Sequence, residues 1–171
     1  MTIKYSNNSK NNSWLKDYNY DYPLVIEDKK FKTLEHYLQY RIQYYSNRKN
    51  FDQVFHVLNR IENKNYSEFI KLVNNTLKKK VKINYDILYQ DYLFARTQKI
   101  VQYPNLLNKL LETKDQLQEV INCDTTKIQS DKQEEFQNSL MHIKCNNTKG
   151  PKEDPWNVIK SILEKGHISA D

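Results

Sequence analysis

Two carboxylates of this chain stand in settings from which they could take part in acid–base chemistry. Glu35 falls in the first turn of a predicted helix, which would hold it rigidly, and Asp124 falls in the polar stretch Cys-Asp-Thr-Thr. A positioned carboxylate can accept a proton, orient a water molecule or stabilise developing positive charge. Each also has a structural interpretation, because Glu35 can be a partner of the helix dipole and Asp124 can cap the following turn.

Other kinds of chemical site are excluded by residue counts. The chain has two glycines, Gly150 and Gly166, whereas a P-loop, a dinucleotide fingerprint and a G-x-S-x-G elbow each need several at fixed spacing. The two cysteines, Cys123 and Cys145, are accompanied at zinc-ligand spacing only by His142. We therefore expect no metal, no cofactor and two free thiols in a reducing cytoplasm.

The net positive charge suggests nucleic-acid binding, but the scarcity of arginine among the basic residues argues against it. The 171 residues include 27 basic and 21 acidic side chains, a net charge of +6. Nearly all the basic residues are lysines, whereas base readout and phosphate clamping favour the bidentate guanidinium. A lysine-rich helical protein with weak nucleic-acid binding is therefore kept as a second alternative. The arginines are Arg41, Arg48, Arg60 and Arg96.

Targeting signals and composition bear on where the protein acts. No apolar run approaches the roughly 18–20 residues that span a bilayer, and residues 1–13 lack the apolar centre of a secretory signal. We therefore expect no membrane partner and a cytoplasmic location. Abundant Lys, Asn, Ile and Tyr with scarce Gly, Ala and Arg are typical of an AT-rich genome, such as that of a giant virus, a protist or a bacterium; a viral protein would act in the host cytoplasm.

The elements that must position these residues are mainly helical. Residues 23–32 (PLVIEDKKFK) predict a short hairpin, and Thr33 can cap a helix that continues to residue 46. Apolar residues at helical spacing predict two helices within residues 51–77 and further helices over residues 85–101, 104–111, 116–121 and 156–165. The predicted fold class is mainly α with a small β-hairpin near the N-terminus.

The predicted domain organisation is a single compact domain over residues 14–171. Residues 1–13 are rich in Asn, Ser and Lys and predict a disordered or loosely attached tail. Residues 122–154 are polar and predict a long loop or insert within the domain.

Two blocks of sequence resemble the NADAR (YbiA-like) family. Residues 23–39, PLVIEDKKFKTLEHYLQ, resemble its entry motif: an apolar strand, a turn, an aromatic residue and then T-[VL]-E-H-Y-x-Q at a helix start. Residues 95–120 resemble the family's long helix with the Q-x-P-x-L and L-L-x-T motifs that follow it, and Asp124 stands where the family has the Asp of D-x-x-W-G. The matching residues are Thr33, Glu35, His36, Tyr37 and Gln39 in the first block and Ala95, Lys99, Gln102, Pro104, Leu106, Leu110, Leu111 and Thr113 in the second.

The resemblance implies a compact, mostly helical, metal-free hydrolase that cleaves an N-glycosidic bond of a ribosylated or ADP-ribosylated base. It implies Glu35 and Asp124 as the catalytic pair, since two carboxylates can divide the labour of glycoside hydrolysis. A small nucleotide-like or ribosylated-base ligand would be its partner. The ligand-binding candidates are Trp14, Tyr18 and Tyr37, which could stack on a base, Lys99, which could face a phosphate, and His36 and Gln39. For His36 a structural hydrogen bond, and for Tyr37 simple packing, are the competing interpretations.

Several positions depart from the family pattern and support an alternative. The family usually carries a lysine seven residues beyond the motif glutamate, and this chain has Ile42, which cannot form a Schiff base. Lys127 and Ile128 replace the Trp-Gly pair of D-x-x-W-G. The alternative is a catalytically lapsed homologue that binds a nucleotide-like ligand or a protein partner. A half-exposed Ile42 would favour the enzyme, and an Ile42 in the core would favour the lapsed homologue.

Overall fold

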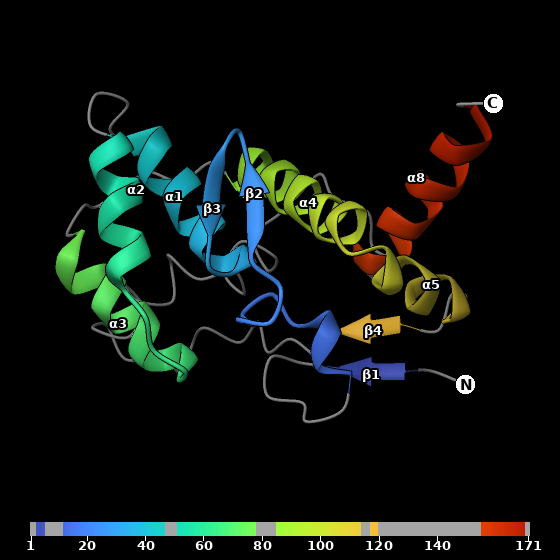
Figure 1. Ribbon diagram of the computed structural model, residues 1–171, viewed down its shortest axis with the longest axis horizontal. Helices are drawn as coiled ribbons and strands as arrows, with labels where there is room; N and C mark the ends of the chain where they lie inside the picture. The colour runs from blue at the N-terminus through green and yellow to red at the C-terminus, as the bar shows by residue number, and fades with distance from the viewer. Residues whose placement is uncertain are drawn as a thin grey trace. The chain divides into compact units, whose positions relative to one another are not determined.

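The computed structural model describes residues 3–5, 12–46, 51–77, 85–113, 117–119 and 155–169. Within these ranges helices predominate, and a two-stranded antiparallel hairpin lies near the N-terminus (Figure 1). The predicted fold class, mainly α with a small hairpin, is confirmed. In chain order the elements are β1 (Ile3–Tyr5), the 3-10 helix η1 (Ser13–Leu15), β2 (Leu24–Ile26), β3 (Lys29–Phe31), α1 (Leu34–Ser46), α2 (Phe51–Arg60), α3 (Tyr66–Thr76), α4 (Tyr85–Gln102), α5 (Pro104–Glu112), β4 (Leu117–Glu119) and α8 (Pro155–Ser169).

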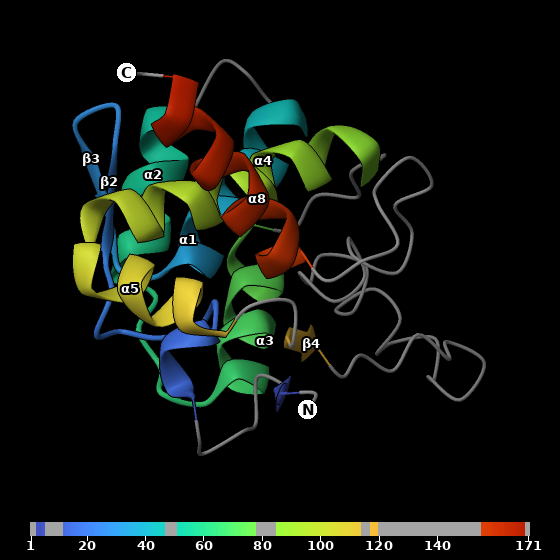
Figure 2. The same ribbon diagram turned by 90° about the vertical axis from the view of Figure 1, so that its right-hand side faces the viewer.

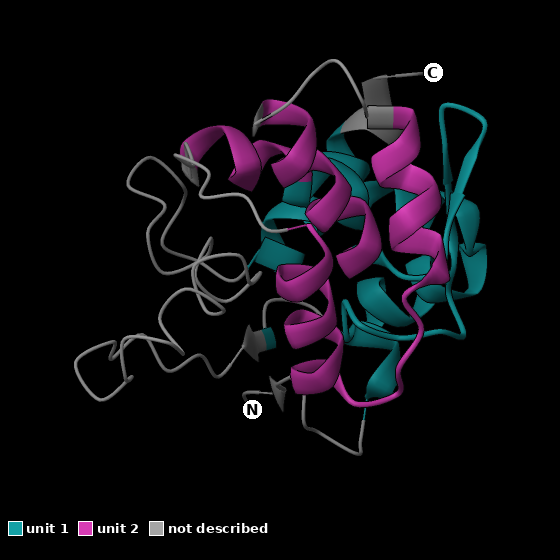
Figure 3. Cartoon of the chain, turned by 90° about the vertical axis from the view of Figure 1, so that its left-hand side faces the viewer, with its two compact units in different colours: residues 1–34, 92–120, 149–171 teal, residues 35–91, 121–148 magenta. Residues whose placement is uncertain are grey.

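The chain divides into two compact units. Unit 1 comprises residues 1–34, 92–120 and 149–171, and unit 2 comprises residues 35–91 and 121–148 (Figure 3). No helix in the described ranges is long and apolar enough to cross a membrane.

The hairpin of β2 and β3 follows the predicted apolar pattern. Leu24 pairs with Phe31, and these two side chains and that of Ile26 are buried on one face. The turn residues Glu27 and Asp28 have φ values of 52° and 64°, the left-handed backbone of a two-residue turn that matches the twist of the strands. Side chains with a Cβ adopt this backbone at some cost, and the buried apolar face of the hairpin offsets it.

Helix α1 is buried around its whole circumference in its first two turns. It begins at Leu34, directly after the predicted cap Thr33, and carries Glu35 in the first turn. A helix with apolar and polar residues buried alike must supply partners for its polar groups, since burying them without partners costs several kcal/mol, about 2–7 each. The buried polar residues of this segment are Thr33, Glu35, His36, Gln39 and Gln43.

Helices α2 and α3 confirm the two amphipathic segments predicted within residues 51–77. Helix α3 is capped by Asn65, whose side chain accepts a hydrogen bond of 3.1 Å from the backbone amide of Glu68. Such a cap satisfies one of the amides that a helix start leaves without an intrahelical acceptor. The buried residues of the two helices include Leu58, Phe69, Ile70 and Val73.

Helices α4, α5 and α8 agree with predicted helices to within a few residues. Helix α5 begins at Pro104, where a missing amide hydrogen costs nothing in the first turn. Helices α5 and α8 contact each other (Figure 2), and both contribute to the apolar core of unit 1. That core consists of Leu15, Ile100, Leu106, Leu110, Leu117, Trp156 and Ile159.

The helix predicted over residues 116–121 is wrong. Residues 117–119 form strand β4, which pairs in parallel with β1, Ile3 opposite Leu117 and Tyr5 opposite Glu119. Its partner β1 lies near the N-terminus, far from β4 in sequence, so the pattern of residues around 117–119 does not predict the pairing. Residues 3–5 of the expected tail thus belong to a sheet, and residues 122–154, the expected loop or insert, lie outside the described residues.

Candidate functional site

The first polar cluster lies in unit 2 around Glu35, whose side chain is fully buried. Its Oε1 accepts a hydrogen bond of 3.2 Å from Gln39 Nε2, one turn along α1, and another of 3.1 Å from the hydroxyl of Tyr66 at the start of α3. A rigid buried carboxylate of this kind can stabilise positive charge or orient a water molecule. We call these three residues the Glu35 cluster.

His36, beside the Glu35 cluster in sequence, is held by the backbone and by an aromatic ring. Its Nε2 lies 2.9 Å from the carbonyl oxygen of Ile61 and therefore carries a hydrogen, because a carbonyl can only accept. Its ring centroid lies 4.5 Å from that of Phe69. These contacts give His36 a structural hydrogen bond that ties α1 to the segment after α2.

Two further predicted positions on α1 are closed to solvent. The Tyr37 side chain is 6% exposed and Ile42 is 1% exposed. Of the two environments that the sequence left open for Ile42, the structure has the core environment. A lysine at this position would bury an ammonium group.

A second polar group in unit 2 joins α1 to Asp91, in the first half of α4. Arg41 Nη2 donates to the hydroxyl of Tyr45 over 2.8 Å, and that hydroxyl donates to Asp91 Oδ2 over 2.7 Å. The guanidinium also lies 4.3 Å from the ring centroid of Tyr44. Burial raises the pKa of the Tyr45 phenol, and its hydrogen bond to Asp91 raises that pKa further. The Tyr45 phenol therefore keeps its proton at neutral pH.

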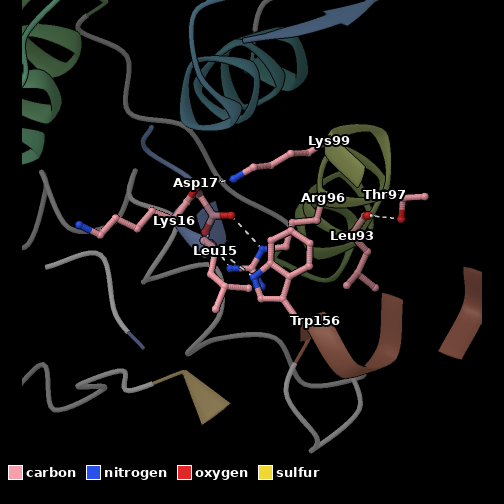
Figure 4. A network of polar contacts seen from close by, with 8 residues as sticks. All are labelled: Leu15, Lys16, Asp17, Leu93, Arg96, Thr97, Lys99 and Trp156. Carbon is pink, nitrogen blue, oxygen red and sulfur yellow. Dashed lines mark hydrogen bonds and ion pairs between the residues drawn. The ribbon is translucent and has the colours of Figure 1, made fainter. Parts of the chain in front are cut away.

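The second cluster lies in unit 1 and centres on a buried ion pair (Figure 4). Arg96 Nε and Nη2 donate to the two carboxylate oxygens of Asp17, each over 2.8 Å, and both side chains are at most 2% exposed. The guanidinium lies 4.3 Å from the ring centroid of Tyr92 and 4.5 Å from that of Trp156. This bidentate geometry is the strong form of the Arg–carboxylate pair.

Lys99 lies beside this ion pair, one turn further along α4. Its Nζ donates to the carbonyl of Lys16 over 2.7 Å and lies 5.0 Å from the ring centroid of Tyr22, and the residue is 1% exposed. Burial lowers the pKa of the Lys99 amine to about 7; Asp17 raises it in part, and Arg96 lowers it further. We call Asp17, Arg96, Lys99, Trp156 and the carbonyl of Lys16 the Lys99 cluster.

The remaining predicted ligand-binding residues lie in unit 1 with Lys99. Trp14 is half-buried and packs against the apolar core. The hydroxyl of Tyr18 lies 2.9 Å from that of Tyr20, and the two rings meet edge to face. Asp124 lies outside the described residues, so of the two predicted catalytic carboxylates the structure describes Glu35.

Several residues of the two clusters were missed by sequence reasoning. Tyr66 begins a helix that carries no matched motif, and nothing in its neighbourhood marks it as a partner of Glu35. Arg96 had a usable signal: it is an arginine in a chain with few of them, flanked by the apolar stretch Tyr-Leu-Phe-Ala of α4. A buried arginine needs a carboxylate, which could have drawn attention to Asp17.

Among the residues that the structure describes, no three His, Cys, Asp or Glu side chains are grouped so that they could hold a metal ion. Comparisons with family models, with curated proteins and with solved structures found no match. The resemblance to the NADAR family therefore rests on the two sequence blocks.

Proposed function

We propose that the chain is a hydrolase that cleaves the N-glycosidic bond of a ribosylated or ADP-ribosylated base. The observation that supports this proposal most is the setting of Glu35. It is the motif glutamate of the first block, it is fully buried, and Gln39 and Tyr66 both direct hydrogens at one of its oxygens.

The reaction explains why such a carboxylate would be useful. Cleavage of the bond between C1′ and the base nitrogen builds positive charge on the ribose, and a carboxylate near C1′ stabilises it and can orient the attacking water. Gln39 and Tyr66 hold this oxygen in a fixed position, and such preorganisation is what this catalytic role requires.

A second candidate function, a lapsed homologue that binds a nucleotide-like ligand without turnover, is favoured by Ile42. That side chain is 1% exposed and stands where the family has its lysine. A chain that had lost the amine could keep the fold and the binding surface while losing catalysis.

The deciding experiment measures hydrolysis and binding on the same protein. Base release from ADP-ribosylated guanine, ribosylamino-pyrimidine phosphates and NAD is followed by chromatography, and binding of the same compounds by calorimetry. Glu35→Gln keeps the shape of the side chain and removes its charge, and we expect it to lower kcat by about a hundredfold or more. Glu112→Gln on α5 is the matched control, because Glu112 is exposed, and it should behave as wild type.

Each outcome assigns one of the two functions or neither. Turnover by wild type and Glu112→Gln but not by Glu35→Gln supports the hydrolase. Turnover that survives in Glu35→Gln moves the catalytic role to another residue. Binding without turnover by any of the three proteins supports the lapsed homologue, and the absence of both refutes the two proposals together.

A further inference from the structure

Residues 15–17 of unit 1, which we call the strap, are each held by a different side chain from a helix (Figure 4). Trp156 Nε1 of α8 donates to the first carbonyl over 3.3 Å, and Lys99 Nζ of α4 donates to the second over 2.7 Å. Arg96 of α4 binds the carboxylate of the third residue through both oxygens. Three side chains thus fasten three successive residues to α4 and α8.

The charges of these three contacts do not balance when Lys99 is protonated. Asp17 supplies one negative charge, and each of its oxygens accepts a hydrogen bond from Arg96. Lys99 donates to a neutral carbonyl. The charges of Asp17, Arg96 and Lys99 sum to zero with an uncharged amine and to one positive charge with an ammonium group, and a buried charge is costly.

The neighbouring elements add no further negative side chain to Lys99 among the described residues. The strap contributes Asp17 and the half-buried Lys16, and the segment after the strap contributes the ring of Tyr22. Helix α8 contributes the ring of Trp156, 5.9 Å from Nζ, and carries the buried residue Lys160 one turn further on. Tyr103 stacks edge to face on Tyr22, and burial raises the pKa of its phenol, so it too stays uncharged near neutral pH.

The direction of the effect follows from the protonation states. Burial lowers the pKa of Lys99 to about 7 while the strap is bound, against 10.5 for a solvated lysine. A released strap, which hydrates the amine, binds more protons between these two values. The equilibrium constant for binding of the strap to α4 and α8 is therefore lowest at and below about pH 7. As the pH rises from there towards 10, this constant increases by up to about tenfold per pH unit.

We propose that the strap is a proton-linked fastening: uptake of a proton by Lys99 releases residues 15–17 from α4 and α8 while the rest of unit 1 stays folded. The proposal is independent of the hydrolase proposal. Trp14 and Tyr18 directly flank the strap in sequence. Release would move both of these aromatic side chains at once.

Amide hydrogen exchange of the strap tests the proposal. The amides of Leu15 and Lys16 donate to the carbonyls of Asn12 and Ser13, each over 3.0 Å, so they exchange when the strap opens. The intrinsic exchange rate rises about tenfold per pH unit, and if opening falls by about the same factor the observed rate stays nearly constant between pH 7.5 and pH 9. We expect this flat profile for both amides in the wild-type chain.

Two variants separate charge from structure. Lys99→Met removes the titrating amine at nearly the same volume, and its strap amides should exchange about tenfold faster per pH unit even if their protection differs from wild type. Lys109→Met, on the exposed side of α5, should keep the flat profile. The decisive readout is how the exchange rate of the strap amides changes with pH. Loss of the hydrogen bond from Lys99 to Lys16 changes this rate at every pH, whereas titration of the amine changes its dependence on pH.

Three results would overturn the proposal. One is a tenfold rise per pH unit for the strap amides of the wild-type chain, and another is a flat profile that persists in Lys99→Met. The third is a flat profile shared by amides in the middle of α5, which would make the linked event the unfolding of unit 1. If Lys99→Met does not fold, the Lys99 Cε resonance of the wild-type chain decides: a midpoint near neutral pH supports the proposal, and one above pH 9 overturns it.

Discussion

Glu35 in unit 2 and Asp17 in unit 1 are both buried carboxylates, and they are held in different ways. Asp17 receives two hydrogen bonds of 2.8 Å from the guanidinium of Arg96, so its charge is neutralised where it stands. The described donors to Glu35, Gln39 and Tyr66, are uncharged, and both act on the same oxygen. The contrast is one of partner type: a charged guanidinium holds Asp17, and the described donors to Glu35 are neutral.

The ion pair of unit 1 should give the largest effect when broken. Asp17→Asn leaves the Arg96 guanidinium buried with a neutral partner, and we expect it to lower the free energy of unfolding by about 4 kcal/mol. Trp14 and Trp156 are the two tryptophans of the chain and both lie in unit 1, so urea titration followed by their fluorescence reports on this unit.

A double variant checks that interpretation. Asp17→Leu with Arg96→Met removes both charges, and it should cost less than Asp17→Asn alone, because no buried charge is left behind. A loss below about 1 kcal/mol for Asp17→Asn would show that the pair contributes little, and the contrast with Glu35 would lose its basis.

Ile42→Lys tests whether unit 2 accepts a charge close in sequence to Glu35. Ile42 is 1% exposed, so the new ammonium group would be buried, and we expect the free energy of unfolding to fall by about 3 kcal/mol. Leu72→Lys on α3 is the control, since Leu72 is 40% exposed and its replacement should cost less than 1 kcal/mol, roughly a surface effect. Denaturation is followed by far-ultraviolet circular dichroism. A stable Ile42→Lys protein with raised glycosidase activity would instead support a diverged enzyme.

The lowered pKa of Lys99 predicts that the free energy of unfolding of unit 1 depends on pH. This pKa is about 7 in the folded chain, below that of a solvated lysine, so the unfolded chain binds more protons above pH 7. Relative to Lys99→Met, the wild-type free energy of unfolding should therefore rise by about 2 kcal/mol from pH 7 to pH 9. Tryptophan fluorescence in urea measures this difference. Lys109→Met should follow wild type, and a difference that stays constant with pH would contradict the lowered pKa.

The smallest effect is expected from the neutral donor of the Glu35 cluster. Tyr66→Phe removes one hydrogen bond to Glu35 Oε1 and keeps the ring, so we expect a loss of about 1 kcal/mol in the free energy of unfolding. Tyr20→Phe, which removes a hydroxyl paired with that of Tyr18 in unit 1, serves as the comparison. If Tyr66→Phe costs as much as Asp17→Asn, the two buried carboxylates depend equally on their partners and the proposed difference between them is wrong.

The sequence by itself determined the elements whose signals are local. The apolar alternation around the Glu27–Asp28 turn predicted the hairpin, Thr33 and Pro104 marked helix starts, and apolar residues at helical spacing marked most of the helices. These features depend on residues within a few positions of one another, which is the range over which backbone propensity and amphipathic pattern act. Glu35 was selected as a candidate for the same reason, by its place in a contiguous motif.

Only the tertiary structure decided which partners these residues have. Glu35 meets Tyr66 across 31 positions, and Asp17 meets Arg96 across 79, while the strand over residues 117–119 exists because residues 3–5 lie beside it. Such pairs are selected by the packing of whole helices, which brings together groups that no sequence pattern connects. The environment of Lys99 also depends on the tertiary structure. The sequence predicted a helix at Lys99, but the burial that lowers its pKa comes from the strap and from Trp156 of α8.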